Sequence, residues 1–388
     1  MQITRRWNVL FVSCFACLLL VAAIYVWQGT HVPAQSLPER FTDSDFWRLV
    51  NEFSEPGGYF RSDNFISNET TFQYVIPDLN RKTKPGGVYL GVGPDQNFTY
   101  IAALRPKLAF ITDIRRQNML LHFVYKAIFE MSANRVEFLS RLFSRPLPDS
   151  LNEGGTTGEL FEALDASAPD PQLAQENLTS VLDRLRITHN FTLSADDVRT
   201  IEYVYRSFVA AGPEIRYSFP NQYGWRRFPS YAELMLEADE EGEHHGYLAS
   251  EENFQIVKHL ELENRIVPIV GDFAGEQALQ SIGRYLKAHQ ATVTAFYTSN
   301  VEFYLFQSED WKRFFHNLAD LPLDENSVFI RAYFNNYGFR FPNQPPGTRS
   351  VTLLDSMPGM LTAYDRGQIR SYFDVIKRSS VRTDDHTR

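Results

Sequence analysis

The chain has 388 residues, 44% of them hydrophobic and 14% aromatic, which is enough apolar material for one large domain or two ordinary ones. The formal net charge of -9 argues against a nucleic-acid partner, because phosphate binding depends on clustered Lys and Arg. Both cysteines, Cys14 and Cys17, lie near the amino terminus. The rest of the chain therefore has no disulfide, no cysteine nucleophile and no thiolate metal site.

The first element is an apolar segment. Val9 to Trp27 carries no charge and is about as long as a helix that crosses a bilayer. Arg5 and Arg6 precede it, so the positive-inside rule puts the amino terminus in the cytoplasm. We expect residues 1–34 to be a single-pass membrane anchor, with the domain outside the cytoplasm, in the periplasm if the source is bacterial. A signal peptide cleaved after Ala34 is the alternative, and it also exports the domain.

Residues 35–86 are predicted to form a helical lead-in. Between Pro38 and Phe60, apolar residues follow the spacing of an amphipathic helix that ends in a turn at Glu55-Pro56-Gly57-Gly58.

A nucleotide-binding pattern follows the lead-in. Val88 to Val92 is predicted to be a buried strand, with glycines at 91 and 93 that let the backbone turn sharply and approach a ligand. A helix from about Asn97 to Leu104 leads to a second strand at Leu108 to Thr112, which ends at Asp113. This order is typical of the first half of a nucleotide-binding βαβ unit, in which the acid accepts hydrogen bonds from ribose hydroxyls.

Beyond a helix at Ile114 to Met131, we expect an insertion at 132–264. Its part from Arg145 to Ala195 is rich in Pro and Gly and is predicted to be a loop region with short helices that could act as a mobile lid. The α/β pattern then resumes, with further strands at Arg265 to Val270, Ala291 to Thr298 and Ser327 to Phe334.

The sequence thus predicts an α/β fold, with a Rossmann-like, doubly wound, mostly parallel sheet and a large helical insertion, preceded by one transmembrane helix. Residues 87–388 would form this domain. Asp272 and Asn300 follow the third and fourth strands, and ligands bind at the carboxyl ends of parallel strands. We expect a small-molecule site there.

The motif series resembles the class I methyltransferase-like fold that binds S-adenosylmethionine. The narrower resemblance, to an uncharacterised bacterial family with that fold, covers most of residues 40 to 335. It rests on the runs Tyr-Leu-Gly-Val-Gly-Pro-Asp-Gln-Asn-Phe-Thr-Tyr, Asp113-Ile-Arg-Arg-Gln-Asn118, Phe228-Pro-Ser-Tyr-Ala-Glu-Leu234, Val270-Gly-Asp-Phe-Ala-Gly275 and Phe296-Tyr-Thr-Ser-Asn-Val301.

The resemblance implies S-adenosylmethionine as the cofactor, without a metal. It would place Gly91 and Gly93 beside the methionine part, Asp113 on the ribose hydroxyls, and Asp272 with Phe273 at the adenine. The predicted cofactor-binding residues are Gly91, Gly93, Asp95, Gln96, Asp113, Asn118, Asp272, Phe273 and Asn300.

Two positions depart from the family pattern. Tyr89 stands where an acid usually holds the cationic amino group of the ligand, and Asp95 stands at the third glycine position. Asp95 would suit a positive sulfonium or amino group, but it would repel a pyrophosphate, which counts against NAD. Asp113 and Asp272 also have a simpler interpretation, because aspartate is a preferred cap at the start of a helix.

Two functions remain open. The domain is either a membrane-anchored methyltransferase-like protein, in which Tyr223, Tyr297 and Asn300 orient the methyl acceptor, or a non-catalytic extracytoplasmic binding or scaffold protein that has kept the fold. His244 and His245 lie in an acidic loop without helical or strand spacing, so we do not expect them to bind a metal.

Overall fold

The computed structural model describes residues 36–379 except 149–150, 152–154, 219–227, 336–340, 342–343 and 345–347. The predicted membrane anchor at 1–34 and the predicted acceptor residue Tyr223 lie outside the described residues. Within them, the helices are too short or too polar to span a bilayer.

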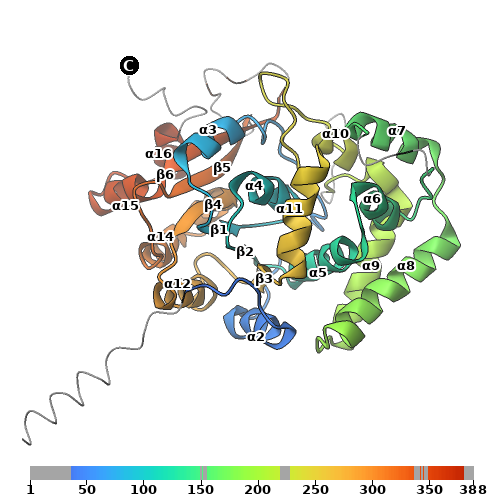
Figure 1. Cartoon of the computed structure of the whole chain (residues 1–388). Coiled ribbons are helices and arrows are strands. Elements are labelled where there is room, and N and C mark those ends of the chain that lie inside the picture. The colour runs from blue at the N-terminus through green and yellow to red at the C-terminus, as the bar shows by residue number, and fades with distance from the viewer. Residues whose placement is uncertain are drawn as a thin grey trace, which may run out of the picture.

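A six-stranded sheet forms the centre of the domain (Figure 1). Its order is β3-β2-β1-β4-β5-β6, and all neighbouring strands are parallel except β5 and β6. The strands are β1 (Val88–Gly91), β2 (Leu108–Asp113), β3 (Ile266–Val270), β4 (Val293–Ser299), β5 (Val328–Phe334) and β6 (Ser350–Ser356). The first five are buried along nearly their whole length, which explains why they appear in the sequence as mostly apolar runs, interrupted in β5 by the ion-paired Arg331. The α/β class and the mostly parallel sheet are as predicted.

Helices cover both faces of the sheet. α4 (Gln96–Leu104), α5 (Arg116–Met131) and α11 (Glu251–Leu262) pack together on one face, while α12 (Ala278–Ala288) and α14 (Trp311–Ala319) follow β3 and β4 and pack on the other (Figure 1). Aromatic rings fill the second interface, where Phe273, Phe296 and Phe314 are in mutual contact.

The segment between α5 and β3 adds a further helical layer. It contains α6 (Arg135–Phe143), α7 (Thr157–Ala166), α8 (Pro171–Asp183), the π-helix η1 (Arg184–Thr188), α9 (Ala195–Ala211), the short 3-10 helix η2 (Gly212–Glu214) and α10 (Tyr231–Met235) before α11. α6 and α9 pack on α5, on the right of Figure 1. Capping boxes start α7 and α9, where Thr156 and Ser194 accept hydrogen bonds from the N–H groups three residues on.

The lead-in runs from the β3 edge of the sheet to the carboxyl ends of the strands. Its first helix, α2 (Asp43–Phe53), is shorter than the helical pattern from Pro38 to Phe60, and it packs against β3 and α12. The chain then runs past two strand tips: the Glu55 N–H donates to the carbonyl of Val270 (3.0 Å), and the Gly58 N–H donates to that of Ile114 (2.7 Å). After residues 59–75, α3 (Ile76–Lys82) leads into β1.

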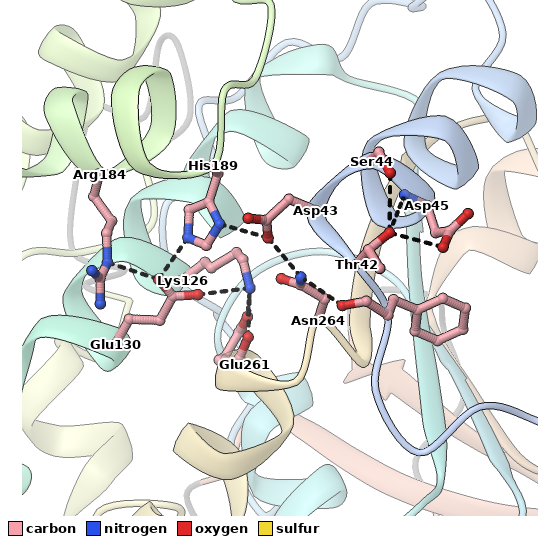
Figure 2. Close-up of polar contacts among 11 residues, drawn as sticks. Thr42, Asp43, Ser44, Asp45, Lys126, Glu130, Arg184, His189, Glu261 and Asn264 are labelled. Carbon is pink, nitrogen blue, oxygen red and sulfur yellow. Dashed lines mark hydrogen bonds and ion pairs between the residues drawn. The ribbon is translucent and has the colours of Figure 1, made fainter.

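A buried ion network joins the lead-in to the helical layer (Figure 2). Lys126 of α5 lies 2.9 Å from Oε1 of Glu130 and 3.7 Å from Oε2 of Glu261. Oε2 of Glu130 lies 2.9 Å from Nε of Arg184 and 2.7 Å from Nε2 of His189. Nδ1 of His189 lies 2.8 Å from Asp43 in α2. The network therefore connects α2, α5, η1 and α11.

After β5 the chain closes the far edge of the sheet. β6 runs antiparallel to β5, and α15 (Met357–Asp365) and α16 (Tyr372–Arg378) follow it, while α13 (Val301–Gln307) lies between β4 and α14. Arg331 of β5 is 1% exposed and pairs with Glu302 of α13 at 2.5 Å. This buried pair fixes α13, whose first residues lie at the tip of β4.

Candidate functional site

Polar side chains gather where the strand order reverses, at the carboxyl ends of β1 to β4. A pocket of about 590 Å³ lies there, within the size range of small-molecule sites. Five of the predicted cofactor-binding residues line it, namely Gly93, Asp113, Asp272, Phe273 and Asn300. The topology therefore brings together residues from four separate strand ends.

The glycine turn after β1 is held in place by Asn97 of α4. The Asn97 amide donates to the carbonyls of Val92, Gly93 and Pro94, and its oxygen accepts from the Tyr89 hydroxyl at 2.9 Å. Gly93 has a φ of +77°, which favours glycine, and a Cβ added there would meet no atom within 4 Å. The turn is thus rigid, and its open side faces the pocket.

Gly91 has a different role from the one expected. It does not line the pocket, and an added Cβ would lie 1.9 Å from Oδ1 of Asn97 and 2.8 Å from the Tyr89 ring. Glycine is required here for packing of the turn. The tyrosine at the usual acid position is part of this packing, because its hydroxyl is already bonded to Asn97.

The other three predicted residues, Asp95, Gln96 and Asn118, lie behind the pocket wall and do not line it. Asp95 is 1% exposed, and its carboxylate oxygens make no hydrogen bond of ordinary geometry with the described residues, although the Tyr247 hydroxyl lies close enough to lower its pKa. Burial raises the pKa of Asp95 to about 7. The Asn118 amide is likewise buried without a described partner. Gln96 acts on the pocket indirectly, by donating to Glu69 at 2.9 Å.

Asp113 projects from the tip of β2 and is already bound by a cation. Nε and Nη2 of Arg115 donate to its two carboxylate oxygens at 3.0 and 2.9 Å, and the Arg115 N–H donates to Oδ1 at 2.9 Å. Both side chains are 7% exposed. Asp113 does not cap α5, because the N-cap residue is Arg115 and no side chain caps the helix. Asp113 instead forms a buried ion pair with Arg115 that the sequence analysis did not include.

Asp272 and Phe273 form the wall beyond β3. Oδ1 of Asp272 accepts from the Ala274 N–H (2.8 Å), and the Asp272 N–H donates to Oε1 of Glu55 in the lead-in (2.7 Å). Burial raises the pKa of Glu55, and the neighbouring charge of Asp272 acts in the same direction. Phe273 is 3% exposed and lines the pocket.

The tip of β4 forms the opposite wall. Ser299 has a φ of +52°, a strained conformation for a residue other than glycine. Its hydroxyl donates to Oε1 of Glu69, a residue of the lead-in. Tyr297, Asn300 and Tyr304 line the same wall.

The lead-in covers the pocket. The segment 59–69 supplies Tyr59, Phe60, Asn64, Ser67, Asn68 and Glu69 to the lining, and Tyr217 completes it. No described residue between 145 and 195 lines the pocket, so a lid formed by this part of the chain stays a prediction. The sequence analysis missed Glu69 because it sits in an aperiodic loop, within the triplet Asn68-Glu69-Thr70, with no strand-tip spacing to identify it.

The pocket is acidic and aromatic. Its lining includes the carboxylates Glu69, Asp113, Asp272 and Asp310 but, among the described residues, a single cationic side chain, Arg115. A site with this balance favours a positively charged ligand. In the described ranges, no three His, Cys, Asp or Glu side chains lie close enough together to hold a metal ion.

Comparison with known proteins gives a family but no activity. A search of curated proteins found no match. Residues 64–148 and 186–357, about two thirds of the chain, match a family model described as a domain of unknown function. The matched ranges contain β1 to β6 and the predicted site residues, and they omit α7 and α8. The chain belongs to the family described as the domain of unknown function DUF7790.

Proposed function

We propose that the pocket binds S-adenosylmethionine or a closely related nucleoside, and that the domain is a Rossmann-like methyltransferase. The observation that carries this proposal is the position of the pocket at the point where the strand order reverses, with Gly93, Asp113 and Asp272-Phe273 on successive strand tips. This is the order in which such a fold would meet the amino acid, ribose and base parts of the ligand.

The acidic lining supports a cationic ligand over a dinucleotide. The sulfonium and ammonium groups of S-adenosylmethionine are positive, whereas a pyrophosphate would be repelled by the carboxylates in the wall. A ribose hydroxyl would donate to Oδ2 of Asp113, which accepts one bond from Arg115 and keeps a further lone pair. Phe273 would provide an apolar surface for the adenine.

The reaction would be an in-line displacement. A lone pair on the acceptor forms the new bond to the methyl carbon, the sulfur–carbon bond breaks, and its electron pair returns to sulfur as a neutral thioether. The protein would contribute by holding donor and acceptor in line in a site largely closed to water.

A second function, a non-catalytic binding protein, has one observation in its favour. In methyltransferases of this fold an acidic residue usually holds the ligand's amino group, and Tyr89 stands at that position here. The Tyr89 hydroxyl is bonded to Asn97, and Tyr89 does not line the pocket. If residues 1–34 anchor the chain with the domain outside the cytoplasm, the cytosolic methyl donor would also be out of reach. A topology reporter fused after Arg388 distinguishes the two locations.

The direct test is calorimetric titration of the full chain in detergent with S-adenosylmethionine, S-adenosylhomocysteine and NAD. We expect saturable binding of the first two and none of NAD. Binding of NAD alone, or of none of the three, would contradict the proposal and leave the non-catalytic alternative.

A further inference from the structure

Glu69 is a buried carboxylate in the pocket wall that comes from neither the sheet nor the helices that follow its strands. It is 1% exposed and lies beside the tip of β4, opposite the walls formed by Asp113 and Asp272. The surrounding loop is fixed to the far edge of the sheet. The Thr70 N–H donates to Oγ of Ser350 at 2.8 Å, and that hydroxyl donates back to the Thr70 carbonyl at 3.0 Å.

The Glu69 carboxylate is held by neutral donors from two other parts of the fold. Gln96 Nε2, at the start of α4, donates to Oε2 at 2.9 Å, and the Ser299 hydroxyl donates to Oε1. The Tyr297 hydroxyl is a further hydrogen-bonding neighbour. The backbone of Ser299 is in the left-handed region, which is strained for a residue other than glycine. This strained residue is one of the donors that orient the Glu69 carboxylate.

No described Lys or Arg forms an ion pair with Glu69, whereas two of the other three carboxylates of the lining are each paired with an arginine. Asp113 pairs with Arg115, Asp310 pairs with Arg313 at 2.5 Å, and Asp272 accepts from the Ala274 N–H. Burial raises the pKa of Glu69, while the hydrogen bonds from Ser299, Gln96 and Tyr297 lower it. A cation arriving beside Glu69 would therefore remove the main cost of ionising it.

The pocket lining is also aromatic. Tyr297 is a hydrogen-bonding neighbour of Glu69, and Tyr304, which lines the pocket, packs edge-on against Phe60 with ring centroids 5.6 Å apart. Tyrosine and phenylalanine faces attract organic cations and exclude water. Charge and shape at this end of the pocket thus favour an amine attached to an apolar group.

We propose that the second ligand of this pocket is an organic amine, whose ammonium group is held by Glu69 while its apolar part lies against Tyr297, Tyr304 and Phe60. This inference rests on the proposed function for one point only, namely that a nucleoside occupies the half of the pocket formed by the ends of β1 to β3. Glu69 is then the residue that selects an amine over an uncharged group. Because an ammonium nitrogen has no lone pair, the carboxylate must also accept one of its protons before the neutral amine can attack the methyl carbon.

The test compares tyramine with tyrosol, which share a phenol and a two-carbon chain but end in an amine and an alcohol. Both are titrated calorimetrically into the full chain, with and without S-adenosylhomocysteine. We expect tyramine to bind at least tenfold more tightly than tyrosol, and Glu69→Gln to remove this preference while leaving S-adenosylhomocysteine binding within twofold. Glu309→Gln removes one exposed charge next to the rim and should change tyramine binding less than twofold.

Ser299→Gly gives a second variant that keeps the fold, because glycine tolerates the backbone of this position. It removes one donor to Glu69 and should weaken tyramine binding severalfold without lowering Tm. Equal affinities for tyramine and tyrosol, no binding of either, or an equal effect of Glu309→Gln would overturn the inference. Glu69-dependent tyramine binding without S-adenosylhomocysteine binding would instead refute the proposed methyltransferase and leave the amine site intact.

Discussion

Arg115 closes over Asp113 and ties the tip of β2 to the segment that covers the pocket. Besides its two bonds to the Asp113 carboxylate, its Nη1 donates to the carbonyls of Asp63 at 2.6 Å and Ser62 at 3.2 Å. Coulombic attraction to Asp113 and the hydrogen bonds between them raise the pKa of Arg115 despite the opposing effect of burial. The acid expected to hold ribose is therefore also a structural residue.

This pairing changes what a substitution of Asp113 would show. Asp113→Ala leaves Arg115 buried without its counter-ion, and removing one partner of a buried pair costs about 3–5 kcal/mol. We expect the double variant Asp113→Asn with Arg115→Gln to be less destabilised than the sum of its single variants, measured by urea denaturation. Additive losses would show that the pair contributes no coupling energy. The effect of Asp113 on S-adenosylhomocysteine binding should be measured by comparing the double variant with Arg115→Gln, because both lack the arginine.

Gly93 offers a cleaner test of the pocket, because the chain contains a matched glycine elsewhere. Gly93 and Gly367 have φ values of +77° and +67°, and a Cβ added at either meets nothing within 4 Å. Alanine at each position should cost a similar stability of about 1–2 kcal/mol through backbone strain. Only at Gly93 does the new methyl enter the pocket. We expect Gly93→Ala to weaken S-adenosylhomocysteine binding at least tenfold and Gly367→Ala to leave it unchanged, by calorimetry. Equal effects would place the ligand elsewhere.

The sheet could be predicted from the sequence because its strands are apolar on both faces. β1 to β5 each begin within two residues of the expected position, and the glycine turn and Asp113 lie at the expected strand tips. β6 was not singled out, because an antiparallel edge strand is fixed by its register with β5, a relation between segments that local patterns do not contain.

The site could be predicted only where it depends on strand ends. Gly93, Asp113, Asp272, Phe273 and Asn300 reach the pocket for that reason. Glu69 and Tyr217 reach it through loops whose path depends on tertiary hydrogen bonds, such as that between Thr70 and Ser350. No periodicity or motif marks them.

Asp95 should make stability depend on pH. Burial raises its pKa from an ordinary value of 3.8 to about 7, so between these values the folded state binds more protons than the unfolded state. The contribution of this carboxyl to the free energy of unfolding is fully present below about pH 4. It is lost as the pH rises through 7, at up to about 1.4 kcal/mol per pH unit. Asp95→Asn cannot titrate, so its free energy of unfolding should rise relative to wild type between pH 4 and 8. Asp165→Asn, on the exposed side of α7, serves as control. If the free energy of unfolding changes with pH in the same way for wild type and Asp95→Asn, the raised pKa of Asp95 is disproved.

The ion network of Figure 2 predicts an order of coupling energies. Burial raises the pKa of Glu261 to about 8, so this carboxyl is largely protonated at neutral pH. Burial would also raise the pKa of Glu130, but the hydrogen bond from His189 and the charge of Lys126 lower it, so Glu130 carries the charge that Lys126 neutralises. Lys126→Met should therefore cost about 3–5 kcal/mol, whereas Glu261→Gln should cost little.

Double-mutant cycles at pH 7 measure the two couplings separately. We expect the coupling of Lys126 with Glu130, at 2.9 Å, to exceed that with Glu261, at 3.7 Å, and the second to grow as the pH rises above 8 and Glu261 ionises. Lys312→Met, at an exposed position of α14, controls for loss of a surface charge. A larger coupling to Glu261 at pH 7 would mean that Glu261 is ionised in the folded protein and would contradict this prediction.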